Sequence, residues 1–218
     1  MIKIEKYIEQ TVLKAQTVDS DIESLIKEAK EYGFVGVCVP PFWVKKAKRE
    51  IGDADIQLVS VVGFPLGYNL TETKVFETEQ LIKMGADEID VVWSLTAFKA
   101  GMNWPKIEIA RLSQVCHDHE RILKVILETA YLSDREIIQA CEICADAGVD
   151  FVKTSTGFAP EGAKESHIKL MRQNLPSSVG IKASGGIKTL EQALRLVQAG
   201  ADRIGTSSGV QIVKSARE

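Results

Sequence analysis

The chain has 218 residues and an ordinary globular composition, 45% hydrophobic and 26% charged. This length is compatible with one domain or two. Because 27 Lys and Arg stand against 30 Asp and Glu, the formal net charge of −3 argues against nucleic acid as the main partner. The longest nearly apolar run, residues 34–44, contains two prolines and is too short to span a bilayer. We therefore expect a soluble, cytoplasmic protein with no nucleic-acid or membrane partner.

Short runs rich in Val and Ile alternate along the chain with helical patterns. Three Ser/Thr-x-x-Glu/Gln capping boxes mark expected helix starts: Ser20–Glu23, Ser133–Glu136 and Thr189–Gln192. The expected strands cover residues 7–13, 34–39, 57–62, 88–93, 122–127, 149–154, 179–183 and 203–206. Because these strands are mostly apolar and alternate with helices, the pattern predicts a parallel sheet.

The eight expected strands begin 23 to 34 residues apart, so the strand–helix units occupy the whole chain. A (β/α)₈ TIM barrel accounts for all eight units within a single domain, residues 1–218. The alternative, an open doubly wound sheet, usually has a Gly-rich dinucleotide loop after its first strand, whereas residues 14–21 here read KAQTVDSD. We predict an α/β fold, a single-domain (β/α)₈ barrel, with its reactive groups at the carboxyl ends of the strands.

Two lysines, Lys153 and Lys182, end the sixth and seventh expected strands. Lysine is rarely buried unless it is paired or functional, and neighbouring strands would bring the two ammonium groups close together. A nearby positive charge in a partly desolvated pocket lowers a lysine pKa, and only a neutral amine attacks a carbonyl. The pair therefore favours Schiff-base chemistry. The alternative is that each lysine extends along the wall with its charged end in water.

Three further charges are expected inside the barrel. Asp90 lies in the apolar fourth strand, where an unpaired carboxylate would be costly. Asp90 is either a proton shuttle that positions Lys182 or one half of a structural salt bridge. Glu9, in the first strand, is a similar but weaker case. Lys124, in the fifth strand, either faces the lumen as a charged neighbour or forms a salt bridge, and the sequence leaves both readings open.

Glycine- and serine-rich turns follow the seventh and eighth strands, at residues 184–186 and 205–209. Glycines let the backbone approach a ligand, and amides at a helix start bind anions. These two loops are the usual phosphate position in a TIM barrel. The turns therefore predict a phosphate site, although glycines in tight turns alone would give the same pattern.

Other chemistries find little support. His117 and His119 fall in a polar stretch before the fifth strand, which we interpret as a solvated loop and not a metal site. Cys141 and Cys144 lie on the apolar stripe of an expected helix and are interpreted as core residues. No dinucleotide loop, P-loop or nucleophile elbow is present. The residues alone thus predict a metal-free, lysine-based barrel that acts on a small phosphorylated carbonyl compound.

At these residues the chain resembles the deoxyribose-phosphate aldolase family. The matching segments run in order from residue 7 to about 209: YIEQTVLK, VGVCVPP, VVGFPLG, TKVFET, GADEIDVV, LKVILET, DFVKTSTGFAPEGA, IKASGGI and GADRIGTSSG. The resemblance implies a class I aldolase, a lyase on a TIM barrel. Such an enzyme reversibly cleaves 2-deoxy-D-ribose 5-phosphate to D-glyceraldehyde 3-phosphate and acetaldehyde without a metal or cofactor.

The same resemblance implies roles for particular residues. Lys153 matches the Schiff-base lysine. Lys182 matches the second lysine, which lowers the pKa of the first and transfers protons, and Asp90 matches the relay aspartate. The phosphate-binding turns of the family match Gly185, Gly186, Gly205, Ser207 and Ser208.

The chain departs from the family pattern in places. Glu9-Gln10-Thr11 replaces the usual Asp-His-Thr, and Trp93, after the fourth strand, is expected to narrow one side of the barrel mouth. The final residues, SARE, lack the C-terminal tyrosine tail of some members. These departures leave room for an aldolase that acts on another small phosphorylated aldehyde, or for a non-catalytic phosphosugar-binding barrel. A sugar-phosphate isomerase or epimerase would need a different base. A homodimer is one expected assembly.

Overall fold

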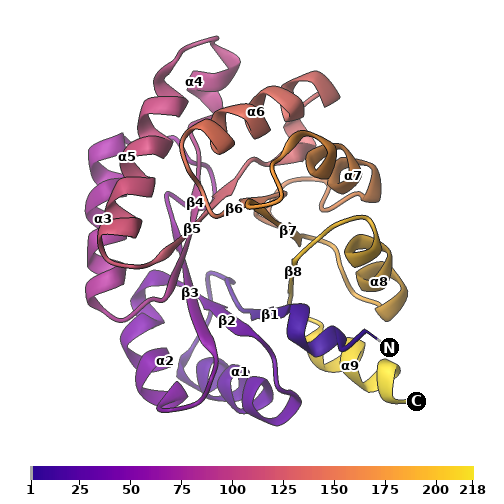
Figure 1. Ribbon diagram of the computed structural model, residues 1–218. Helices are drawn as coiled ribbons and strands as arrows, with labels where there is room; N and C mark the ends of the chain where they lie inside the picture. The colour runs from indigo at the N-terminus through magenta and orange to yellow at the C-terminus, as the bar shows by residue number, and fades with distance from the viewer. Residues whose placement is uncertain (1) are drawn as a thin grey trace.

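The computed structural model describes residues 2–218 and contains a closed barrel of eight parallel strands. The strands follow one another in sequence order, and the last pairs with the first, which confirms the predicted TIM-barrel fold (Figure 1). The strands are β1 (Ile8–Thr11), β2 (Gly36–Val39), β3 (Gln57–Val62), β4 (Glu88–Val92), β5 (Ile122–Ile126), β6 (Phe151–Lys153), β7 (Gly180–Ser184) and β8 (Arg203–Thr206).

Helices surround the barrel, and the two ends of the chain lie near each other beside the last helix (Figure 1). The α-helices are α1 (Asp19–Tyr32), α2 (Val44–Ile51), α3 (Thr71–Lys83), α4 (Leu95–Lys99), α5 (Trp104–Asp118), α6 (Asp134–Asp146), α7 (Glu165–Asn174), α8 (Leu190–Gln198) and α9 (Gly209–Arg217). The short 3₁₀ helices are η1 (Ile4–Tyr7), η2 (Pro41–Trp43) and η3 (Thr129–Tyr131).

The predicted helix starts are correct in two cases of three. Ser133 and Thr189 cap α6 and α8 as expected, each in a complete capping box. The first predicted box, Ser20–Glu23, is wrong, because α1 has its cap two residues earlier, at Val18, and places Ser20 inside its first turn. The Asp21 carboxylate accepts the hydrogen bond of the Val18 N–H there, at 2.9 Å. In an Asp-Ser-Asp run several side chains compete for the capping position, so the box alone did not fix the helix start.

All eight predicted strands exist, but several are shorter than their apolar runs. The sixth strand, for example, covers residues 151–153 and not 149–154. Flanking residues such as Asp150 and Thr154 still donate single backbone hydrogen bonds to the neighbouring strands, to Leu123 O and Lys182 O, but lie outside the regular ladder. The apolar runs therefore predicted where the strands lie, but they predicted less accurately where each strand begins and ends.

The hydrophobic core has two parts. A large cluster fills the space between strands and helices, and a small one, Cys38, Val59 and Val61, is separate from it. Cys141 and Cys144 are buried in the large cluster, which confirms their interpretation as core residues. Burial raises the pKa of the Cys141 thiol to about 12, so this thiol stays protonated at neutral pH.

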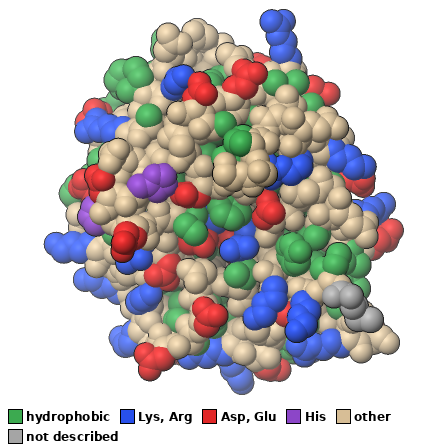
Figure 2. Space-filling model, viewed as in Figure 1, with side chains coloured by type: hydrophobic (Ala, Val, Ile, Leu, Met, Phe, Trp, Pro, Cys, Tyr) green, Lys and Arg blue, Asp and Glu red, His purple; other side chains and the backbone are tan. Residues whose placement is uncertain are grey.

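The surface agrees with the near-balanced charge of the sequence. Basic and acidic side chains are interspersed around the outline of the face shown in Figure 2. None of the helices within residues 2–218 combines the length and the apolar character needed to cross a bilayer. The prediction that His117 and His119 lie in a loop is wrong for His117, which is in the last turn of α5. There the His117 Nε2 atom lies 3.0 Å from a carboxylate oxygen of Asp150.

Candidate active site

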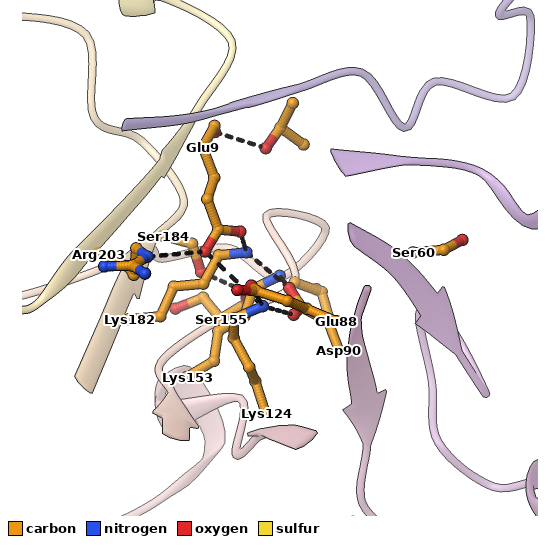
Figure 3. A network of polar contacts seen from close by, with 12 residues as sticks. Glu9, Ser60, Glu88, Asp90, Lys124, Lys153, Ser155, Lys182, Ser184 and Arg203 are labelled. Atoms are coloured by element: carbon orange, nitrogen blue, oxygen red, sulfur yellow. Dashed lines mark hydrogen bonds and ion pairs between the residues drawn. The ribbon is translucent and has the colours of Figure 1, made fainter. Parts of the chain in front are cut away.

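Six buried charged side chains converge inside the barrel from five strands, of which β4 to β7 are adjacent and β1 lies beyond β8 (Figure 3). Residues two apart on a strand point to the same side, so alternate positions along these strands face the lumen. In formal charge, three lysines face three carboxylates. The cluster consists of Glu9 on β1, Glu88 and Asp90 on β4, Lys124 on β5, Lys153 on β6 and Lys182 on β7.

Asp90 is the centre of this cluster. Its Oδ2 atom accepts hydrogen bonds from Lys153 Nζ and Lys182 Nζ, each at 2.7 Å. Its Oδ1 atom accepts a third hydrogen bond, from Lys124 Nζ at 3.0 Å. Lys153 and Lys182 are also direct partners in the β6–β7 register. Because they share one oxygen atom, the two ammonium groups are no farther apart than twice 2.7 Å.

Lys182 has a second carboxylate partner, because its Nζ also donates to Glu9 Oε2. The other oxygen, Glu9 Oε1, receives no hydrogen bond within the described chain and lies 3.7 Å from Lys124 Nζ and from Arg203 Nε. Lys124 also forms an ion pair with Glu88. The open question about Lys124 thus has a double answer, since this lysine lies in the lumen and is also salt-bridged.

The electrostatics of the cluster favour charged groups. Burial raises the pKa of Asp90, but the neighbouring lysines outweigh burial and hold this pKa well below its usual value. Burial lowers the pKa of Lys182, but the carboxylates of Asp90 and Glu9 outweigh burial and raise this pKa above normal. The structure places Asp90 against Lys182, which is one of the expected arrangements, and adds Glu9 as a second carboxylate. Together these carboxylates keep Lys182 a cation beside Lys153.

A cavity of about 460 Å³ opens above the cluster, at the carboxyl ends of the strands. Lys153 lines this cavity, although only 3% of the residue is exposed. The buried amine therefore reaches a space that could hold a small molecule, while Asp90 and Lys182 lie against it from within the barrel. Lining residues from the predicted turns are Ser184, Gly185, Gly186, Gly205, Thr206 and Ser207.

The predicted phosphate turns thus face the same cavity as Lys153. Gly185 and Gly186 have φ of 87° and 75°, in the left-handed region that glycine adopts without strain. Gly205 has a second function, because a Cβ atom there would lie 3.1 Å from Lys182 Cε. Ser208 differs from the others: it lines a neighbouring depression beside the start of α9 and not the cavity itself.

Trp93 does not narrow the barrel mouth, so that prediction is wrong. The Trp93 side chain is fully buried among the core residues, its Nε1 donates to the Leu127 carbonyl at 2.9 Å, and its ring lies 4.5 Å from that of Phe98. Trp93 directly follows β4, three residues after Asp90, so it lies on the opposite side of the strand and packs against Phe98 of α4.

Several residues of the cavity wall were not identified as site residues from the sequence. Thr156 and Phe158 follow Lys153 in the KTSTGF segment and line the cavity. Gln10, noted only as a departure from the family pattern, lies between the cavity and α9, because its Oε1 accepts from Gly209 N at 3.0 Å. The position of Thr156 and Phe158 shortly after the end of β6 was a usable signal. Within residues 2–218, no three His, Cys, Asp or Glu side chains are grouped as a metal site.

A closed parallel barrel whose buried lysine opens into a cavity beside a second lysine has the arrangement of a class I, Schiff-base aldolase. The comparisons with known proteins agree. Residues 3–215 match the DeoC/LacD family aldolase, and this chain belongs to that family. The deoxyribose-phosphate aldolase of Thermococcus gammatolerans is 48% identical, over 98% of this chain and 96% of that protein. The corresponding protein of Streptococcus equi subsp. zooepidemicus is 47% identical, over 98% and 96%.

Solved structures show the same fold. QR15, described as an aldolase, has a TM-score of 0.94 and 41% identity, covering 100% of this chain and 97% of that one. The deoxyribose phosphate aldolase from Aeropyrum pernix, described as a unique tetramer, has a TM-score of 0.92 and 32% identity, covering 99% and 91%. The resemblance to the aldolase family is thereby confirmed.

Proposed function

We propose that this enzyme reversibly cleaves 2-deoxy-D-ribose 5-phosphate to D-glyceraldehyde 3-phosphate and acetaldehyde. One observation carries the proposal: the amine of Lys153 lines a cavity that the Gly/Ser turns after β7 and β8 also line. A sugar phosphate whose phosphate binds these turns presents its aldehyde to a lysine. The names of the relatives, at up to 48% identity over nearly their full length, support the same substrate.

The proposed reaction begins when the neutral amine of Lys153 adds to C1 of the open-chain sugar, and loss of water gives an imine. Removal of the C3 hydroxyl proton then breaks the C2–C3 bond, and its electron pair moves to the protonated imine to form an enamine. Glyceraldehyde 3-phosphate leaves at this point. Protonation of C2 and hydrolysis of the imine release acetaldehyde and restore Lys153.

Asp90 and Lys182 fit the proton transfers in this sequence. Asp90 Oδ2 accepts from both Nζ atoms at 2.7 Å, so a proton can pass from Lys153 to Asp90 without a change of partner. Lys182 stays cationic beside Asp90 and Glu9, so it can supply a proton during the reaction. The phosphate is assigned to the turns that contain Gly185, Gly186, Gly205, Ser207 and Ser208, with Ser208 at the edge of the site.

The test is an acetaldehyde-release assay with 2-deoxy-D-ribose 5-phosphate. The proposal expects turnover in the wild type and none above background in Lys153→Leu. A wild-type protein that binds the sugar phosphate but releases no acetaldehyde would instead be the non-catalytic binding barrel. Because Trp93 does not narrow the barrel mouth, Glu9 is the remaining reason to consider an aldolase that acts on another phosphorylated aldehyde. A screen of acceptor aldehydes in which glyceraldehyde 3-phosphate is clearly best would exclude that variant.

We further propose that residues 1–218 form one functional domain in the cytoplasm and assemble at least as a homodimer. Met1 lies outside the described residues. Support for an assembly comes from the exposed apolar side chains on and beside α3 and α5, and from the solved relative described as a tetramer. The exposed side chains are Tyr68, Leu70, Phe76, Met102, Trp104 and Ile107. Light scattering of the purified protein counts the subunits, and a monomer at micromolar concentration would contradict this proposal.

A further inference from the structure

Glu128, on the turn between β5 and α6, is a buried carboxylate that the proposed reaction does not use. Its φ of 57° lies in the left-handed region, which few residues other than glycine adopt. The backbone on both sides is tied to β6 and the residue after it. Leu127 N donates to the Lys153 carbonyl, and Thr129 N donates to the Thr154 carbonyl, each at 2.9 Å. Such an uncommon conformation persists where the surrounding structure holds it.

The hydrogen bonds that the Glu128 carboxylate receives within the described chain all come from Thr156. The Thr156 N–H lies 3.3 Å from each carboxylate oxygen, and the Thr156 hydroxyl donates to Glu128 Oε2. Thr156 lines the cavity together with Lys153. Glu128 thus holds the backbone and the side chain of a residue on the cavity wall.

These contacts fix the direction of the Thr156 hydroxyl. A threonine hydroxyl has one proton to donate and two lone pairs to accept with. An ionised carboxylate can only accept, so the proton points to Glu128. One lone pair accepts from the Phe158 N–H, with 3.1 Å between nitrogen and Thr156 Oγ1. The lone pair that remains is available to the cavity, so Thr156 faces a ligand as an acceptor.

Burial raises the pKa of Glu128 above its usual value, and the hydrogen bonds from Thr156 and the positive charge of Lys153 act in the opposite direction and limit that rise. The N–H and the hydroxyl of Thr156 both donate to the carboxylate, which is the arrangement that suits an ionised acceptor. If Glu128 is replaced by a neutral residue, nothing compels the Thr156 hydroxyl to donate its proton to residue 128. The charge of Glu128 therefore determines the direction of the Thr156 hydroxyl.

We propose that Glu128 is a positioning residue that acts through Thr156 and makes this part of the cavity wall select a substrate hydroxyl. This inference rests on the proposed function and adds to it. In the proposed reaction, C1 is attached to Lys153, the phosphate is bound by the glycine turns, and the C3 hydroxyl loses its proton. The C4 hydroxyl, which becomes the C2 hydroxyl of glyceraldehyde 3-phosphate, keeps its proton and is the donor that fits Thr156.

The test uses Glu128→Gln, which keeps the shape of the side chain. The amide NH₂ can donate to Thr156 Oγ1, so the Thr156 hydroxyl becomes free to point its proton into the cavity. The aldol condensation is measured with acetaldehyde and two acceptors, glyceraldehyde 3-phosphate and 3-oxopropyl phosphate, which lacks the hydroxyl. We expect the variant to lose roughly five- to tenfold of the wild-type preference in kcat/KM for the hydroxylated acceptor, mainly through its KM.

Two further variants separate this role from a merely structural one. Glu142→Gln changes an exposed glutamate on α6 and should keep the full preference. Thr156→Val removes the hydroxyl, and the Glu128→Gln/Thr156→Val double variant should lose no more preference than Thr156→Val alone, because both changes act through one hydroxyl. Borohydride trapping of acetaldehyde on Lys153 should remain unchanged in Glu128→Gln.

The inference is overturned if Glu128→Gln traps acetaldehyde normally and discriminates between the two acceptors as the wild type does. It is also overturned if the losses in the double variant are additive. A failure of the proposed function has a different signature: the wild type itself then neither traps acetaldehyde on Lys153 nor converts deoxyribose 5-phosphate.

Discussion

Two groups of buried ion pairs among residues 2–218 differ in their surroundings. Outside the barrel, between α3 and α5, Lys74 Nζ donates to Glu108 Oε1 at 2.7 Å and to the Val92 carbonyl at 2.9 Å. Glu108 also accepts from Thr71 Oγ1 at 3.0 Å and from Ser94 N at 3.1 Å. One cation thus meets one carboxylate, each with further hydrogen bonds, and neither lines the cavity.

The cluster in the lumen is arranged differently. Asp90 Oδ2 is shared by two lysines, one oxygen of Glu9 has no hydrogen bond within the described residues, and Lys153 opens into the cavity. Burial of charge alone therefore does not mark an active site here. A shared acceptor and access to a cavity distinguish a lysine that can react from one that stabilises the fold.

The largest expected effect comes from Lys153→Met. Without the amine no imine can form, so kcat for deoxyribose 5-phosphate cleavage should fall at least about 10³-fold. The fold should persist, because Asp90 keeps Lys124 and Lys182 as partners. Steady-state kinetics measure kcat, and circular dichroism shows whether the fold persists. As a control, Lys169→Met, at an exposed lysine on α7, should retain full activity. A variant at Lys153 with substantial activity would remove the distinction between the two clusters.

The converse change is Lys74→Met. It leaves the Glu108 carboxylate buried without its cation, which costs about 3–5 kcal/mol in the free energy of unfolding. The variant that remains folded should keep its kcat, because Lys74 does not line the cavity. Urea unfolding measures the free energy of unfolding, and initial rates measure kcat. A stable Lys74→Met with impaired kcat would show that this pair serves the chemistry and not the fold.

A smaller effect on stability is expected for Asp90→Asn, since Glu9 and Glu88 remain as counter-charges. The pKa of Asp90 is lowered in the folded state, so its carboxylate stabilises the fold above the ordinary value of 3.8. That contribution is lost as the pH falls through the lowered folded value. The stability difference between wild type and Asp90→Asn should therefore be largest near pH 7 and shrink in acid. A stability difference that grows as the pH falls would contradict the lowered pKa of Asp90 in the folded state.

An exposed pair provides the surface reference. Lys99 donates to both Glu136 oxygens at 2.7 and 2.8 Å, and this contact, with that of Ser133, lowers the pKa of Glu136 to about 2. Glu136→Gln should lower Tm by at most about 2–4 °C at pH 7. This difference should vanish as the pH falls from 4.5 toward 2. Calorimetry at several pH values measures it, and a loss as large as that in Lys74→Met would erase the contrast between surface and buried pairs.

Much of the fold was predictable because it repeats. Eight apolar runs separated by helical patterns are compatible with few architectures, and the closed barrel in sequence order is the one observed. Strand ends were less predictable, since apolar residues also fill turns. The direction of Trp93 was predictable but missed: counting alternate positions from Asp90 along β4 places it on the helix side.

The candidate site also has a part that was predictable from the sequence and a part that was not. Lys153, Lys182 and Asp90 could be proposed from sequence because each lies in or at the end of an expected strand. Contacts between distant segments could not: Glu128 and Thr156 are 28 residues apart, and Lys74 and Glu108 are 34 apart on separate helices. Nothing in the residue types specifies these partners. The pairing of Asp90 with Lys182 was proposed from the sequence, whereas the contact of Glu9 with Lys182 became visible only once the strands were placed in the barrel.

The central claim is that Lys153, and not any other lysine of the chain, forms the covalent bond with the substrate. Incubation with acetaldehyde, reduction with borohydride and peptide mass spectrometry test it directly. We predict a single ethyl group on Lys153 in the wild type and none in Lys153→Met. An adduct on Lys182 or Lys124 with Lys153 unmodified, or no adduct in a protein that turns over deoxyribose 5-phosphate, would contradict the account.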